Sequence, residues 1–332
     1  TQTTPDGPFD IVVAGEAISG LDFGNRTSAV SGVAFNDVGV IGTYEPSEDE
    51  LLPGAAVYLD VNRDGSPGQD DVMVDPDDFL PDQVLDFVTS GATLMAVDAD
   101  NNPIDIDVTA SSDDVVSPDG QLFTREGDAA WPDDERLRIN FESPAAEVNL
   151  EFIAASSEGP ERGIMIAYSH QGVEIDSATT GLLLQGQRQM LSINRSGFDV
   201  AYVVAYTVES PTGDGRLDNL SATIVAEPVA ITDDLGGYVF KPLAAGDYRV
   251  GALPGGNQNQ TFPEESVYEV DVELGEEAME INFGFVFDNL PPEAEPDSVA
   301  ILEDQPVAIG VLTNDIDPDG ILNEGSLSIT QS

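Results

Sequence analysis

The sequence contains no cysteine and, among 332 residues, a single histidine, His170. Without cysteine the chain cannot form disulfides, thiolate nucleophiles or zinc–thiolate sites. A lone histidine excludes metal sites built from several imidazoles and argues against most histidine-based catalytic triads. Soft transition metals are therefore poor candidates as ligands, and hard cations bound by oxygen are better ones.

Basic residues are also scarce, because 11 lysines and arginines stand against 63 aspartates and glutamates, which gives a net charge of −52. A field of this sign repels phosphate backbones and anionic membranes, so we expect no nucleic-acid partner. No run of ~18 apolar residues is present, so we expect no direct membrane insertion. Two interpretations of the charge stay open: solubility in a salt-rich habitat, or cation binding by clustered carboxylates.

Helical periodicity is scarce, and short alternating apolar runs are common, for example at 137–141 and 148–153. Glycine (32 residues) and proline (22 residues) interrupt these runs at intervals typical of β-sandwiches. The sequence therefore predicts an all-β fold, with one short helix over 81–89. The chain length suggests roughly two or three domains.

Two separated segments, 31–65 and 231–250, together resemble one known repeat. They carry its characteristic residues at matching spacing: Phe35, Asp37, Leu52-Pro53-Gly54, Val57-Tyr58-Leu59-Asp60, Thr232-Asp233, Gly237-Tyr238, Phe240, Leu243, Gly246, Tyr248 and Val250. The segments resemble the SdrD B-like repeat, one of the Cna-B-like immunoglobulin-type sandwiches of bacterial surface proteins. The resemblance implies a discontinuous β-sandwich over 28–75 and 226–289. A folded insertion in a surface loop adds little loop-closure entropy, so such nesting is tolerated.

The intervening residues, 76–225, are predicted to form a separate inserted domain. Their alternating strands and the closing Asp218-Asn219-Leu220 resemble the jelly-roll, carbohydrate-binding-module-like domains of secreted bacterial proteins. Trp131 is the only tryptophan, and we expect it in the core or as a loop anchor rather than as a platform for sugar stacking.

The two ends of the chain resemble parts of further domains. Residues 1–27 resemble the closing hairpin of a preceding SdrD B-like domain. Residues 290–332 comprise a proline-rich linker and a segment that resembles the N-terminal part of a tandem cadherin-like repeat, through Asn314-Asp315 and Asp317-Pro318-Asp319-Gly320. We expect the chain to be a piece of a longer protein, with any export signal and anchor outside it.

The sharpest candidate for a cation site begins at Asp60. Asp60, Asn62 and Asp64 stand at positions one, three and five of a calcium-loop pattern, and Gly65 allows the sharp turn at position six. Asp71 stands at position twelve, where its shorter arm predicts a weaker site than glutamate would give. The alternative is an aspartate-rich solvated turn.

A second candidate follows from the resemblance to the B-like repeat, which implies a calcium site in the loop after Asp37. The other acids of this cluster are Glu45, Glu48, Asp49 and Glu50, of which Glu45 and Glu48 are its further candidate ligands, and Asp233 is implied as a completing ligand. The alternative is a charged, solvated loop.

Two more candidates follow from the other resemblances. The cadherin-like segment implies a calcium site at Asp315, Asp317 and Asp319. In the insert, Asp218 is a candidate for a structural calcium, with Glu126 and Asp128 as candidate partners. Again the alternative is a set of solvated charges.

The sequence therefore predicts a non-enzymatic, calcium-stabilised segment of a large secreted or cell-surface bacterial protein. Its role would be adhesion, matrix structure or display, with calcium as the cofactor and glycans or other surface and matrix proteins as candidate partners. Two alternatives stay open. The insert at 76–225 is a carbohydrate-binding module or, with less support, a glycosidase; or the whole segment is a structural spacer.

Overall fold

The computed structural model describes residues 2–4, 24–25, 27–85, 87–88, 91–113, 117–125, 128–208 and 214–288. Over these residues the chain is all-β, as predicted, apart from one short 3-10 helix. The helix expected over 81–89 is wrong, because two short strands lie there, β7 (Gln83–Val84) and β8 (Phe87–Val88). None of the described segments is a helix long and apolar enough to cross a membrane.

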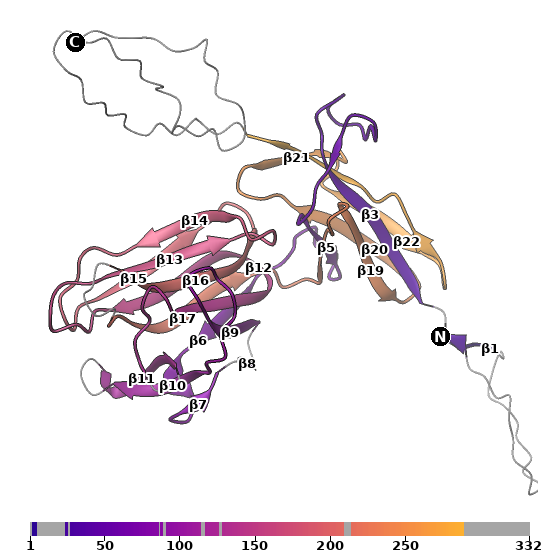
Figure 1. The fold of residues 1–332 in the computed structure, drawn as a ribbon. Coiled ribbons are helices and arrows are strands. Elements are labelled where there is room, and N and C mark those ends of the chain that lie inside the picture. The colour runs from indigo at the N-terminus through magenta and orange to yellow at the C-terminus, as the bar shows by residue number, and fades with distance from the viewer. Residues whose placement is uncertain are drawn as a thin grey trace, which may run out of the picture.

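Two β-rich units lie side by side in Figure 1. We call residues 27–60 and 229–288 the host unit and residues 70–224 the insert unit. Residues 61–69 are the first crossing between them, and residues 225–228 are the return crossing. Before the host unit, β1 (Gln2–Thr4) pairs antiparallel with β2 (Gly24–Asn25). Most of the hairpin predicted at 1–27 and all of 290–332 lie outside the described residues.

The host unit is built from two sheets. One has the strand order β18-β5-β20-β22, and the other has the order β19-β3-β24-β21, with β4 and β23 also paired to β3. The strand bounds are β3 (Ser28–Asn36), β4 (Glu50–Leu51), β5 (Ala56–Asp60), β18 (Val229–Ile231), β19 (Gly237–Leu243), β20 (Gly246–Leu253), β21 (Gln258–Phe262), β22 (Val267–Val272), β23 (Glu277–Ala278) and β24 (Phe283–Phe287).

The host core lies between these sheets. Val30 and Ala34 of β3 pack there with Val57 of β5 and Phe283 of β24. A side chain at Gly32 would place its Cβ 1.9 Å from a carbonyl oxygen of the neighbouring segment, so only glycine lets β3 run this close.

The insert unit contains the larger core. Its elements are β6 (Asp70–Val74), η1 (Pro76–Asp78), β7, β8, β9 (Ala92–Val97), β10 (Val108–Asp113), β11 (Ser117–Arg125), β12 (Arg136–Ile153), β13 (Arg162–Tyr168), β14 (Glu174–Thr179), β15 (Arg188–Asn194), β16 (Val200–Val208) and β17 (Arg216–Ile224). The first half of β12 pairs with β9 and β16, and its second half pairs with β15 and β17.

The register of β12 shifts between Asn140 and Ala145, where Pro144 interrupts the strand. Proline has no N–H to donate to a ladder and is tolerated at such irregularities. The shift lets one long strand serve both pairings. Leu137 before it and Leu150 after it belong to the same buried cluster, which also contains Trp131.

The segment 70–74, which we expected in the host sandwich, is β6 and pairs with β17 in the insert unit. The crossing into the insert therefore falls at 61–69 rather than near residue 75. The return crossing follows β17, and β18 then pairs with β5 of the host. Both crossings thus begin or end next to Asp60.

An apolar cluster joins the two units. Phe198 of the insert and Val225 at the return crossing pack with Ala56, Tyr58 and Leu253 of the host. Burial of these side chains favours contact between the two units over an arrangement in which only flexible linkers join them.

Candidate functional site

The first crossing is folded around the carboxylate of Asp60. This residue ends β5 and is buried, and its two oxygens accept hydrogen bonds from the backbone N–H groups of Asp64 (3.2 Å) and Gly65 (2.8 Å). Gly65 has φ +81°, a backbone conformation that side chains disfavour. The Asn62 side chain accepts a further bond from the Asp64 N–H (2.9 Å). The sharp turn expected at Gly65 is therefore present.

A residue of the return crossing closes this loop. The carboxylate of Glu227 accepts hydrogen bonds from the N–H groups of Val61 and Asn62, each at 3.3 Å, and its own N–H donates to the carbonyl of Pro67 (3.1 Å). Glu227 thus ties the two crossings together. Burial, with the charges of Asp60, Asp64 and Glu227 adding to it, raises the pKa of the neighbouring Tyr58.

Asp71, the predicted twelfth-position ligand, lies instead on β6. Its side chain is exposed and accepts a hydrogen bond of 3.5 Å from the hydroxyl of Thr223 on β17. Glu227, rather than Asp71, is the acid from beyond this segment whose carboxylate accepts from the backbone N–H groups of the first crossing. Sequence reasoning missed Glu227 because it stands 166 residues from Val61 and reaches it only through the fold.

The loop after β3 is folded around Asp37, which is 1% exposed. Its Oδ2 accepts hydrogen bonds from the Gly42 N–H (2.7 Å) and from the Thr261 hydroxyl (2.5 Å). Its Oδ1 is buried and has no hydrogen-bond partner among the described residues. An unsatisfied oxygen on a buried carboxylate is costly, which makes this atom a candidate for contact with a cation.

Three more acids of the same loop, Asp49, Glu45 and Glu48, lie close to Asp37 in sequence. Asp49, which is buried, accepts from the N–H groups of Val38 (3.2 Å) and Glu45 (2.6 Å), and Glu45 accepts from the Val40 N–H (2.7 Å). Glu48 is exposed, and its backbone N–H donates to the carbonyl of Glu45 (2.9 Å). The loop is thus organised by carboxylates that accept from backbone amides.

The side chain of Asp233 accepts hydrogen bonds within the turn that contains it. Its Oδ1 accepts hydrogen bonds from the N–H groups of Leu235 and Gly237, each at 2.9 Å, just before β19. These bonds are local, so they do not link Asp233 to the loop after Asp37.

The described part of the chain contains no group of three aspartate, glutamate or histidine side chains placed closely enough to hold a metal. The carboxylates of both host loops face backbone amides instead of one another. The orphaned Oδ1 of Asp37 is the feature that fits a hard cation, because it is a buried carboxylate oxygen without a hydrogen-bond partner in the described residues.

Asp218 is buried in β17 beside other charges. Burial raises its pKa to about 7; the Asn219 N–H opposes this shift, the charges of Glu151 and Asp75 add to it, and Arg188 opposes it. Arg188 lies 2.9 Å from Glu151 and 3.7 Å from Asp218. The cation beside Asp218 is therefore an arginine. Asp128, expected as a partner, lies instead against Arg125.

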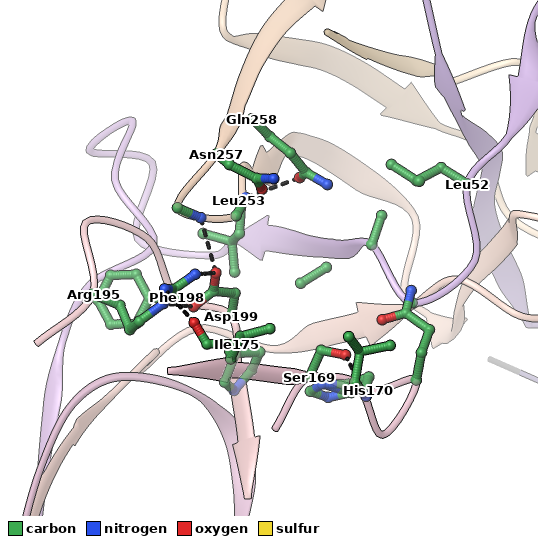
Figure 2. A pocket seen from close by; sticks show the side chains of 18 of the residues that line it. Leu52, Ser169, His170, Ile175, Arg195, Phe198, Asp199, Leu253, Asn257 and Gln258 are labelled. Atoms are coloured by element: carbon green, nitrogen blue, oxygen red, sulfur yellow. Dashed lines mark hydrogen bonds and ion pairs between the residues drawn. The ribbon is translucent and has the colours of Figure 1, made fainter. Parts of the chain in front are cut away.

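A cleft of about 600 Å³ lies between the two units (Figure 2). Arg195 of the insert makes two hydrogen bonds with Asp199 (3.0 and 2.7 Å), and Asp199 also accepts from the N–H of Gly256 in the host (2.8 Å). His170 lines the cleft, and desolvation lowers its pKa, so the imidazole is neutral near pH 7. Arg195 is already paired with Asp199, and residues of both units line the cleft. We therefore describe the cleft as a junction between the units.

Trp131 is fully buried in the insert core, and its indole N–H donates to the carbonyl of Phe123 (2.7 Å). The expectation that it belongs to the core is confirmed, so it offers no surface for a sugar. Glu126, Asp315, Asp317 and Asp319 lie outside the described residues.

No protein-family model matches the chain, and no curated protein matches its sequence. Among solved structures, the enzymatically active domain of tailspike protein 4 from bacteriophage CBA120 is similar to part of it, at 15% identity and a TM-score of 0.26. The match covers 41% of this chain and 20% of that chain. A similarity of this size does not assign a fold or an activity.

Proposed function

We propose that this chain is a non-enzymatic, calcium-stabilised segment of a large secreted or cell-surface protein that serves adhesion, matrix structure or display. The observation that carries the proposal is the Oδ1 atom of Asp37, a buried carboxylate oxygen without a hydrogen-bond partner in the described residues. The net charge of −52 supports it, because a dication near clustered carboxylates relieves their repulsion.

In the loop after β3, Asp37 would supply the first ligand, and Asp49 and Glu45 are the neighbouring acids that would join it. Calcium supplies a point of double positive charge that oxygen ligands can surround at variable geometry. Binding requires Asp49 and Glu45 to exchange some bonds to backbone amides for bonds to the ion. The bound ion would then compensate the buried negative charge that the closed loop otherwise leaves unpaired.

At the first crossing, Asp60, Asn62, Asp64 and Glu227 are the oxygen donors that would form a second site. The charges of Asp60, Asp64 and Glu227 already concentrate beside Tyr58. An ion there would hold the two crossings together and stiffen the connection between host and insert. Asp71 and Asp233 are weaker candidates, because each points to a partner in its own strand pair or turn.

The finer architecture belongs to the same proposal. The host unit would be an SdrD B-like, immunoglobulin-type sandwich and the insert a jelly-roll, with a cadherin-like repeat following at 290–332. Two packed sheets with one core in the host support the first assignment. Extracellular or cell-surface placement follows from these resemblances and is proposed with them.

The proposal is tested by calorimetric titration of calcium into the full chain and into its Asp37→Asn variant. We expect the variant to lose one binding event or to bind it at least about tenfold more weakly, because calcium prefers charged oxygen ligands. The matched control is Asp271→Asn, which removes one exposed charge from β22. Equal titration curves for all three proteins would overturn the proposal.

A further inference from the structure

One face of the insert carries a row of three side chains to which the proposed function gives no role. Along β12, Leu137 and Ile139 belong to the core, so Arg138 between them lies on the opposite face of the sheet. The neighbouring strand β16 carries Tyr202, whose register partner on β13 is Tyr168. The row Arg138–Tyr202–Tyr168 therefore crosses three adjacent strands.

These three side chains form one stack. The rings of Tyr202 and Tyr168 are nearly parallel, at 11°, with centroids 4.8 Å apart, which is the spacing of adjacent strands. The rings therefore stand side by side on the sheet. The guanidinium carbon of Arg138 lies 3.7 Å from the centroid of Tyr202, and its Nε donates to the Asn140 side chain (2.8 Å).

The polar ends of the stack are free to meet a ligand. All three side chains are partly exposed. In the part of the chain that the structure describes, the phenol hydroxyls of Tyr168 and Tyr202 have no hydrogen-bond partner. Burial raises the pKa of Tyr202, so its hydroxyl remains a donor as well as an acceptor at neutral pH.

Arg138 also differs from most other arginines of this acidic protein. Within the described residues, no carboxylate lies within ion-pair distance of it. By contrast, a carboxylate oxygen lies within 4.0 Å of Arg63, Arg125, Arg136, Arg188, Arg195 and Arg249. The chain has 63 acidic residues, but in its described part none of them pairs with Arg138, which is held on a tyrosine ring. Arg138 is therefore suited to bind an anion from outside the chain.

We propose that the Arg138–Tyr202–Tyr168 row binds a glycan through a sugar that bears a carboxylate. The planar guanidinium matches a carboxylate in fork geometry, which lysine cannot reproduce. The two phenols both donate and accept, as the hydroxyls of a sugar do. Met95 and Ile166 on the same face are partly buried apolar neighbours for the C–H groups of a sugar ring.

The net charge of the protein limits this ligand. A long polyanion is repelled by −52 charges, but salt screens that repulsion beyond about 8 Å at physiological ionic strength. The row therefore suits a glycan in which single acidic sugars stand among neutral ones. This inference goes beyond the proposed function, since calcium binding in the host unit neither requires nor excludes it.

The test is a titration of the full chain with disaccharides that end in glucuronate, galacturonate or mannuronate, each compared with its methyl ester. The ester keeps the ring and hydroxyls and removes the charge. We expect at least one acid to bind in the millimolar range or tighter and its ester to bind at least about tenfold more weakly, as for loss of one charged hydrogen-bonding pair.

Variants separate the stack from general charge effects. Arg138→Gln should reproduce the loss seen with the ester, Arg138→Lys should recover only part of it, and Tyr168→Phe should weaken binding about three- to tenfold through its lost hydroxyl. Arg249→Gln on the host is the matched control and should bind normally. Fluorescence of the buried Trp131 verifies that each variant is folded.

Three outcomes would overturn the proposal. They are the absence of binding by every acid at 10 mM (about 2.7 kcal/mol of binding free energy), equal binding of acid and ester, and full binding by Arg138→Gln. Stronger binding of an acidic peptide than of any sugar acid would also overturn it and would assign the row to a protein partner.

Discussion

The carboxylate of Asp199 on the insert accepts a hydrogen bond from the backbone N–H of Gly256 on the host, over 2.8 Å. The same carboxylate holds Arg195 through two further bonds. One acid therefore connects the two units and orients the arginine that lines the cleft between them. Beside it, Phe198 packs into the apolar cluster that the units share.

Replacing Asp199 should loosen this junction. Asp199→Ala leaves Arg195 with Asp176 at 4.0 Å and removes the bond to Gly256, which we expect to cost about 1–3 kcal/mol of coupling between the units. Scanning calorimetry should then resolve the unfolding transitions of host and insert farther apart than in the native chain. Glu269→Ala, which removes an exposed partner of Arg249, is the control. The same transition pattern in both variants would contradict this role.

The charge of Asp218 should make the insert less stable as the pH rises. Its folded-state pKa of about 7 exceeds the ordinary value of 3.8. Between these values the folded state holds a proton that the unfolded state has lost, so this group's contribution falls as pH rises through the window. Asp218→Asn should remove that part of the slope and raise the urea midpoint at pH 8 relative to the native chain.

The comparison at pH 5 and pH 8 uses the difference between variant and native chain, because the other acids titrate in both. Asp271→Asn is again the matched control for loss of one exposed charge. If Asp218→Asn shifts the midpoint equally at both pH values, the carboxylate is not protonated in the folded protein, and the assignment fails.

Glu161 should be one of the costliest acids to remove from the insert. It is fully buried and accepts hydrogen bonds from the N–H groups of Ala155 (2.6 Å), Ser156 (2.9 Å) and Asp214 (2.9 Å). Glu161→Ala leaves three amides without this acceptor, and we expect a loss of about 3 kcal/mol or more. Urea unfolding followed by Trp131 fluorescence measures it.

Glu161→Gln should fall between the native chain and Glu161→Ala, since it keeps one acceptor oxygen. The control is Glu142→Ala, an exposed acid on β12. A loss for Glu161→Ala no larger than for Glu142→Ala would show that the buried carboxylate does not organise this segment.

The sequence predicted the all-β class because local patterns specify it. Alternation along β3 and β12 marks strands, and the two halves of the repeat-like pattern flank the insert. The exact crossing was not predictable in this way. The segment 70–74 alternates like any strand, and only its pairing with β17 assigns it to the insert.

The same distinction between local patterns and contacts made by the fold applies to the candidate sites. Asp60, Asn62, Asp64 and Gly65 are neighbours in sequence, so their turn could be predicted. Glu227 meets that turn, and Arg188 meets Asp218, only because distant strands pair. The orphaned oxygen of Asp37 is a property of burial, which the sequence pattern does not specify.

The most direct test of the account is thermal unfolding of the full chain in calcium, in magnesium and in EGTA, at constant ionic strength. At ~1 mM calcium and a dissociation constant of ~0.1 mM, one site adds about 1.4 kcal/mol. That corresponds to about 6–11 °C for a unit of the size of the host. We expect calcium to raise the host transition by this amount, magnesium to raise it less, and Asp37→Asn to lose most of the calcium effect. Equal shifts with both ions, or an unchanged calcium shift in Asp37→Asn, would contradict the account.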